Sequence, residues 1–201
     1  MTKLLDRDRW VFHQKTKIIE LNIDFEILDE QGAQIGMVRQ EGQSQLKKMA
    51  RLVSSLDQFM THTLAVYDLD GTKVVELTRP RKVFKSTVLV KDAAGADLGR
   101  IVQQNMVGKI KFALQDAGGG DLGSLNAENW RAWNFSIKDP AGQEVARITK
   151  TWEGLARTLF TTADHYMLEV NGDIAPALRP IVLASAAGVD LALKQNARGL
   201  N

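Results

Sequence analysis

A short pattern that recurs five times constrains the fold of this chain more than any other feature. It consists of an aspartate, a glycine three residues later, an apolar residue three places after the glycine and a second apolar residue three places after that. Repetition of this kind marks a supersecondary unit copied along the chain. The aspartates are Asp29, Asp68, Asp92, Asp116 and Asp139, and the glycines are Gly32, Gly71, Gly95, Gly119 and Gly142.

Each copy is predicted to be the turn of a β-hairpin. Apolar residues stand four and two places before every aspartate, as Phe25 and Ile27 do in the first copy, and such alternation is typical of a strand. Aspartate accepts hydrogen bonds from nearby N–H groups, and glycine adopts positive φ easily. The two apolar residues after each glycine have opposite parity in a regular strand. Either a bulge therefore lies near Gly36, Gly99 and Gly123, or one of the two faces outward.

The spacing of the copies predicts a barrel. The last four aspartates are 24, 24 and 23 residues apart, enough for two strands and two short connections, and the first spacing is 39. The extra residues hold a predicted amphipathic helix at about 44–57. Further strands are expected at 166–170 and at either 10–12 or 16–21. We predict a mainly β fold, a single closed antiparallel barrel of about twelve strands, with residues 1–201 as one domain.

The C-terminal segment is predicted to be a buried helix at about 177–195. From Pro180 to Val189 it is apolar on all sides, and a helix of that kind must be buried. A membrane span needs about 20 largely uncharged residues, whereas only ten separate Arg179 from Asp190. Burial inside the barrel is therefore favoured over burial in lipid. A barrel filled in this way cannot serve as a pore.

Composition narrows the classes of function. Lys and Arg number 26 against 24 Asp and Glu, so we expect no nucleic-acid partner. The absence of cysteine fits a reducing compartment, and early acidic residues do not fit a signal peptide, so a cytoplasmic protein is expected. His13, His62 and His165 lack the paired spacing of a metal site and are interpreted as structural. Because no nucleophile or acid–base pair stands out, neither catalysis nor a cofactor is expected.

Two other features each have a functional and a purely structural interpretation. Asp68-Leu-Asp70-Gly71 is similar to the start of an EF-hand loop, but its glycine comes too early, so a hairpin turn is favoured. The four tryptophans could mark a lipid interface, although a place in the core is favoured because a buried indole contributes much apolar area. They are Trp10, Trp130, Trp133 and Trp152.

The residues from Ile148 to Tyr166 carry a resemblance to a known family. Ile148-Thr-Lys-Thr-Trp-Glu-Gly, then Thr-Ala-Asp-His-Tyr166, then the apolar helix, resemble the phospholipid scramblase family and the LURP-one-related proteins. The resemblance covers about residues 10–195. It implies the tubby C-terminal-like fold, a twelve-stranded barrel around a central helix, in a bacterial member linked to phospholipid scrambling or phosphoinositide binding. Scramblases have been proposed to bind calcium after their Ala-Asp pair, but here only Asp164, Glu169 and Asp173 follow, so no metal is expected.

A basic run between the second and third hairpins is the candidate binding surface. If Ser86 and Val88 point inward, Lys85 points outward, and by the same alternation Lys109 and Lys111 also face out. Each cation near an anionic surface contributes about 1 kcal/mol of attraction. The candidate headgroup contacts are Arg79, Arg81, Lys82, Lys85, Lys109 and Lys111.

We therefore predict a non-enzymatic, peripheral phospholipid-binding protein of the scramblase or LURP-one-related type, on the inner face of the membrane. Its expected partner is an anionic phospholipid surface. The alternative is that the basic run is simply solvated and that the barrel is a soluble scaffold that binds another protein and has no lipid role. An exposed apolar patch or an open strand edge would favour that alternative.

Overall fold

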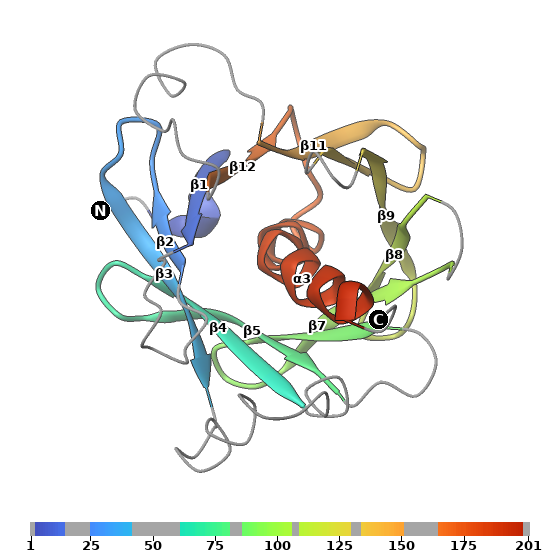
Figure 1. Cartoon of the computed structure of the whole chain (residues 1–201), viewed down its shortest axis with the longest axis horizontal. Coiled ribbons are helices and arrows are strands. Elements are labelled where there is room, and N and C mark those ends of the chain that lie inside the picture. The colour runs from blue at the N-terminus through green and yellow to red at the C-terminus, as the bar shows by residue number, and fades with distance from the viewer. Residues whose placement is uncertain are drawn as a thin grey trace.

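Twelve strands and one long helix make up the part of the chain that the computed structural model describes (Figure 1). Residues 3–14, 25–41, 61–80, 86–105, 109–129, 134–150 and 165–198 are described. The strands are β1 (Arg9–Gln14), β2 (Phe25–Leu28), β3 (Gln34–Glu41), β4 (His62–Asp68), β5 (Lys73–Arg79), β6 (Thr87–Asp92), β7 (Asp97–Gln103), β8 (Lys111–Asp116), β9 (Asp121–Asn129), β10 (Asn134–Lys138), β11 (Glu144–Thr149) and β12 (His165–Val170). A short 3₁₀ helix, η1 (Leu4–Asp6), precedes them, and α3 (Arg179–Arg198) follows them.

The strands form the predicted closed antiparallel barrel. Each strand pairs with its neighbours in sequence, and β1 pairs with β12 to close the ring. The strand predicted at 166–170 is β12, and of the two alternatives near the start, the strand at 10–12 is β1. The other alternative, 16–21, and the helix predicted at 44–57 lie outside the described residues.

The five aspartates form five turns with the same backbone hydrogen bonds. In each turn the aspartate N–H donates to the carbonyl four residues later, and the glycine N–H donates back to the aspartate carbonyl at 3.0 or 3.1 Å. The glycines have φ between 83° and 89°, the left-handed region in which glycine is least strained. The predicted hairpins are confirmed, and the turns all lie at one end of the barrel, which we call the turn end.

A β-bulge follows every turn and settles the parity that the sequence left open. In the first hairpin Leu28 pairs with Gln34 and Ile27 with Gly36, which leaves Ile35 unpaired. The same shift recurs in the other four hairpins. The unpaired residues are Ile35, Val74, Leu98, Leu122 and Val145. Because a bulge re-aims the side chain, both apolar residues of each copy contact the core: the second is buried in every copy, and the first is buried in the last copy, as Val145, and partly buried in the other four.

The helix α3 lies inside the barrel, as predicted (Figure 1). Every residue from Ile181 to Ala187 is buried, so this part of the helix is enclosed on all sides. Its contact with the wall is close, since a Cβ added to Gly188 would lie 3.5 Å from Ile101 and 3.6 Å from Leu77. Among the described residues no helix is both long enough and apolar enough to cross a membrane. Trp10 is fully buried, while Trp130, Trp133 and Trp152 are outside the described residues.

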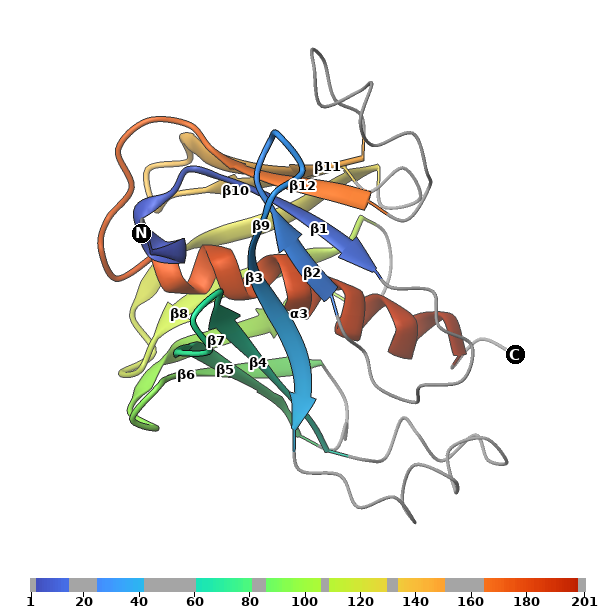
Figure 2. The same ribbon diagram turned by 90° about the vertical axis from the view of Figure 1, so that its left-hand side faces the viewer.

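The two ends of the barrel differ in what they hold. Figure 2 shows α3 starting beside η1 at the turn end and running lengthwise through the barrel. At its start, the guanidinium of Arg179 donates to the Arg7 carbonyl at 2.8 Å and to the Asp8 carboxylate at 3.0 Å. The opposite end, where one hairpin leads into the next, we call the link end. β5 ends and β8 begins there, so it is the end that concerns the candidate cations.

Candidate functional site

Lys109 and Lys111 lie at the link end with exposed side chains. Phe112 points into the core, and strand alternation therefore turns Lys111 outward, as predicted. Asn105 fixes the backbone of both lysines, because its side-chain amide donates to the Lys109 carbonyl and its side-chain oxygen accepts from the Lys111 N–H at 3.0 Å. The backbone that carries these two cations is thus held in place by Asn105.

Hydrogen bonds from inside the barrel extend to the Asn105 loop. Gln103 is buried on β7, and its side-chain oxygen accepts from the Ser86 N–H at 3.3 Å. Its side-chain nitrogen donates to the Asn105 carbonyl at 2.9 Å. Gln103 therefore connects β6 to the loop that carries the lysines. Sequence analysis did not find this residue, although its parity with Ile101 would have placed it inside.

Arg79 lies inside the barrel and not on its outer surface. It is 3% exposed and shares the inward face of β5 with Val75 and Leu77, opposite His62 on β4. Strand alternation is the reason, because β5 extends as far as Arg79 and keeps its parity. The structure thus separates Arg79 from the exposed lysines. Arg81, Lys82 and Lys85 lie outside the described residues, while Ser86 and Val88 point inward as expected.

Polar residues, four of them buried and Gln40 partly buried, continue along the inner wall at the link end. Gln40, His62, Arg79, Ser86 and Gln103 occupy the link ends of β3 to β7 in turn, with Ser86 directly before β6. Gln40 and His62 approach to 3.5 Å through the amide nitrogen and the ring Nδ1. The inner wall of β3 to β7 is therefore apolar at mid-barrel and polar at this rim. In the sequence, the rim can be recognised only because the inward-facing position nearest the link end of each of these strands is polar, whereas the other inward-facing positions are apolar.

Two acidic residues of the outer wall are engaged in ion pairs. Glu41 lies 2.9 Å from Lys73 and also accepts a hydrogen bond from the Tyr67 hydroxyl, which lowers the pKa of Glu41. Glu128 lies 2.7 Å from Arg147, whose hydrogen bond lowers the pKa of Glu128. Both carboxylates are therefore ionised at neutral pH and matched by a cation. Lys109 lies close enough to Glu128 to contribute to its lowered pKa, but within the described part of the chain neither Lys109 nor Lys111 forms an ion pair.

The three histidines, which look scattered in sequence, are partly brought together. The rings of His13 on β1 and His165 on β12 stack with centroids 4.1 Å apart, and His13 Nδ1 lies 3.4 Å from Glu26. The pairing of β1 with β12 produces this contact, which sequence spacing could not reveal. Nowhere in the described ranges do three histidine or acidic side chains gather as metal ligands would. Glu169, in the stretch compared with a calcium segment, instead pairs with Arg9 at 2.7 Å.

The described surface offers little for a protein partner to bury. Leu69, in the second turn, is the single large apolar side chain that is well exposed among the described residues. None of the twelve described strands has an open edge, because the ring is closed. The features that would favour the scaffold alternative are therefore weak in this part of the molecule.

Comparison with known proteins identifies one family. The family model described as Scramblase matches residues 1–193, nearly the whole chain and all strands of the barrel. A search of curated proteins found no match.

Proposed function

This chain belongs to the scramblase family, and from that premise we propose that it is a non-enzymatic protein that binds the surface of anionic phospholipid membranes through the link end of its barrel. The observation that supports this most is the exposed pair Lys109 and Lys111, which forms no ion pair among the described residues. Arg81, Lys82 and Lys85 add to it in sequence, since they fall between β5 and β6.

The mode of binding follows from the packing of the helix. Because residues 181–189 of α3 are enclosed by the barrel, their apolar side chains are unavailable to lipid, and we assign the membrane contact to the outer surface. Cations near an anionic leaflet each contribute about 1 kcal/mol, and the attraction falls off within the Debye length. Binding would therefore be weak, reversible and sensitive to salt. Anionic lipid is concentrated on the cytoplasmic leaflet, so the cytoplasm and the inner membrane face are the proposed location.

Arg79 has a different part in this proposal. Its buried position at the rim excludes direct contact with a flat membrane in this conformation. We assign the surface contact to the exposed lysines and assign to Arg79, with Gln103, the support of the rim from inside. The scaffold alternative remains the competing function, and the same experiment separates the two.

The test is sedimentation with vesicles of phosphatidylserine and phosphatidylcholine, and with phosphatidylcholine alone. We expect binding only to the anionic vesicles. The double variant Lys109→Gln/Lys111→Gln should weaken it roughly 30-fold, as about 2 kcal/mol requires. The matched control Lys91→Gln/Lys138→Gln removes the same charge near the turn end and should change binding less than about threefold.

Equal binding to both kinds of vesicle, or to neither, would overturn the proposal and favour the scaffold alternative. A control variant that loses as much affinity as the link-end variant would also overturn it, because the effect would then reflect net charge alone. Raising the salt concentration should weaken binding of the wild-type protein more than that of the link-end variant.

A further inference from the structure

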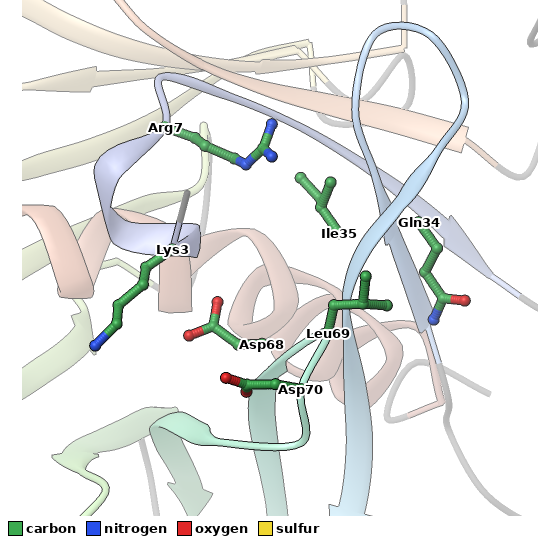
Figure 3. Close-up of a pocket in the computed structure, with 7 residues that line it drawn as sticks. All are labelled: Lys3, Arg7, Gln34, Ile35, Asp68, Leu69 and Asp70. Atoms are coloured by element: carbon green, nitrogen blue, oxygen red, sulfur yellow. The ribbon is translucent and has the colours of Figure 1, made fainter. Parts of the chain in front are cut away.

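A pocket of about 420 Å³ opens at the turn end, away from the candidate lysines. Its walls come from the N-terminal segment, the first hairpin and the turn of the second hairpin (Figure 3). Its volume is in the range of small-molecule sites. The lining residues are Lys3, Arg7, Gln34, Ile35, Asp68, Leu69 and Asp70.

The second turn, which forms one wall, departs from the other four in sequence. It alone has a second acid, Asp70, directly before its glycine, and it alone has a large apolar residue, Leu69, after its first aspartate. Leu69 is 43% exposed. Neither residue is needed to close a hairpin, since the other copies close without them.

The second turn also departs from the others in its hydrogen bonds. In the third turn, Asp92 Oδ1 accepts from the N–H groups of Ala94 and Ala96 within its own turn. Asp68 Oδ1 instead accepts from the Leu4 N–H at 2.8 Å, 64 residues away. Asp70 takes over the local role by accepting from the Thr72 N–H at 2.8 Å. The result places two carboxylates beside the pocket.

Opposite charges line the pocket, and Lys3 lies close enough to Asp70 to contribute to the lowered pKa of that carboxyl. The cations come from the N-terminal segment and the anions from the second turn, and no ion pair joins Arg7 to either carboxylate in the described part of the chain. Figure 3 shows Arg7 on one side and the two carboxylates on the other, with Ile35 and Leu69 alongside. The Arg7 Nε is buried and has no hydrogen-bond partner within the described residues, which leaves a donor available to a ligand.

The two charged walls are fixed in place. The Arg7 carbonyl accepts from Arg179, and Leu4 is fully buried, so the N-terminal segment is anchored to the helix and the core. The Thr72 N–H lowers the pKa of Asp70, which keeps this carboxyl ionised at neutral pH. A guanidinium prefers phosphate or carboxylate, and a carboxylate accepts hydrogen bonds from an ammonium group.

We propose that this pocket binds a small zwitterion in which a phosphate group is joined by a short spacer to a primary ammonium group, the chemistry of phosphoethanolamine. Arg7 binds the phosphate, Asp68 and Asp70 bind the ammonium, and Ile35 and Leu69 pack against the spacer. A quaternary ammonium is disfavoured, because it has no N–H to donate and the lining has no aromatic ring to receive it. The choice of phosphate over carboxylate rests on the proposed phospholipid binding. The ligand could come from a lipid headgroup or from a soluble phosphoester.

Titration calorimetry with soluble glycerophosphoethanolamine tests the site, with glycerophosphocholine and inorganic phosphate as comparison ligands. We expect the ethanolamine compound to bind best, and Arg7→Gln and Asp70→Asn each to weaken it about tenfold or more. Asp70→Asn keeps the oxygen that accepts from Thr72, so the turn should stay intact. The control variants Arg100→Gln and Asp173→Asn alter exposed residues away from the pocket and should have no effect.

Neutral vesicles with and without phosphatidylethanolamine distinguish the two sources. Binding to the soluble compound alone indicates a soluble phosphoester, and added binding to ethanolamine vesicles, lost in Arg7→Gln, indicates a lipid headgroup. The proposal is overturned if neither the soluble compound nor the ethanolamine vesicles bind. It is also overturned if inorganic phosphate binds equally well and Asp70→Asn changes nothing.

Failure of the proposed ligand pocket can be distinguished from failure of the proposed membrane binding. Arg7→Gln and Asp70→Asn should leave sedimentation with anionic vesicles unchanged, whereas Lys109→Gln/Lys111→Gln should leave binding of the soluble compound unchanged. Each proposal is therefore tested by variants that spare the other.

Discussion

The two ends of the barrel are built by different means. At the turn end, five connections use one template, with the same aspartate, the same glycine and the same backbone hydrogen bonds. At the link end, the described residues follow no template, and the inner rim holds polar side chains that differ from strand to strand. The repeated template accounts for the barrel wall, and the residues that depart from the template are the candidates for binding. By the same argument the second turn, where Asp68 and Asp70 divide the usual task, stands out among its neighbours.

The largest expected effect comes from the element that both ends share. Ala187 is fully buried in α3, so Ala187→Asp places an unpaired charge inside the barrel. We expect the loss of several kcal/mol, enough to unfold the protein or make it insoluble. The measurement is thermal denaturation followed by circular dichroism. Ala177→Asp, at an exposed position before the helix, is the control and should melt like the wild type. A cooperative melt of Ala187→Asp near the wild-type temperature would contradict an enclosed helix.

The next prediction asks whether the turn end is fixed by the turns or by the bulges beside them. Gly142 lies in a turn at φ 84° with open space around it, so Gly142→Ala should cost about 1 kcal/mol from the backbone alone. Gly99 follows the third bulge, where an added Cβ would lie 2.1 Å from the Gln115 carbonyl oxygen. Gly99→Ala should therefore cost roughly 3 kcal/mol or more. Equal losses in the two free energies of unfolding would show that the bulges are not the tighter constraint.

A third prediction compares two aspartates of the template. Asp68→Ala removes the acceptor of the Leu4 N–H, so exchange of the Leu4 amide hydrogen should become about fivefold faster, as a loss of about 1 kcal/mol implies. Asp92→Ala should leave Leu4 unchanged and instead speed exchange at Ala94 and Ala96. Hydrogen exchange measured by NMR resolves these sites. If both variants act only on their own turns, the second turn has no special tie to the N-terminal segment.

How far the sequence predicts this molecule depends on how local each feature is. The turns and the buried helix follow from residues a few places apart, so Asp-x-x-Gly and the apolar run at 180–189 were sufficient to predict them. The bulges could not be predicted in the same way, because they depend on cross-strand pairing. From the parity of the two apolar residues, a bulge and an outward-facing residue were equally possible. Arg79 could have been placed inside from its parity with Val75 and Leu77, had β5 been extended to it.

Contacts between distant segments could not be predicted from the sequence. The stack of His13 on His165 depends on barrel closure between β1 and β12, and the pocket depends on a contact between Leu4 and Asp68. The one available signal was in the second turn, where Leu69 and Asp70 differ from the corresponding residues of the other copies. That departure was visible as sequence, but its meaning required knowing which segment lies opposite.

The smallest expected effect concerns the ion pair that ties the link end of β3 to the start of β5. The hydrogen bond from Tyr67 lowers the pKa of Glu41 below its ordinary value of 4.5, and the bond to Glu41 raises the pKa of Lys73 to about 12. A carboxyl with a lowered pKa in the fold stabilises the protein above pH 4.5, and this contribution is lost as the pH falls through the lowered value. The side chains are partly exposed, so at most about 1 kcal/mol is involved.

Urea denaturation at pH values on both sides of 4.5 measures this contribution. Glu41→Gln should lose less stability than the wild type as the pH falls, because it has no carboxyl to protonate. Tyr67→Phe keeps the carboxyl but removes the hydrogen bond that is the main cause of the lowered pKa, so its pH dependence should lie between the other two. If all three proteins lose stability in parallel, the pair contributes nothing measurable. The link between the two ends of this wall would then rest on the strand pairing of β3, β4 and β5 alone.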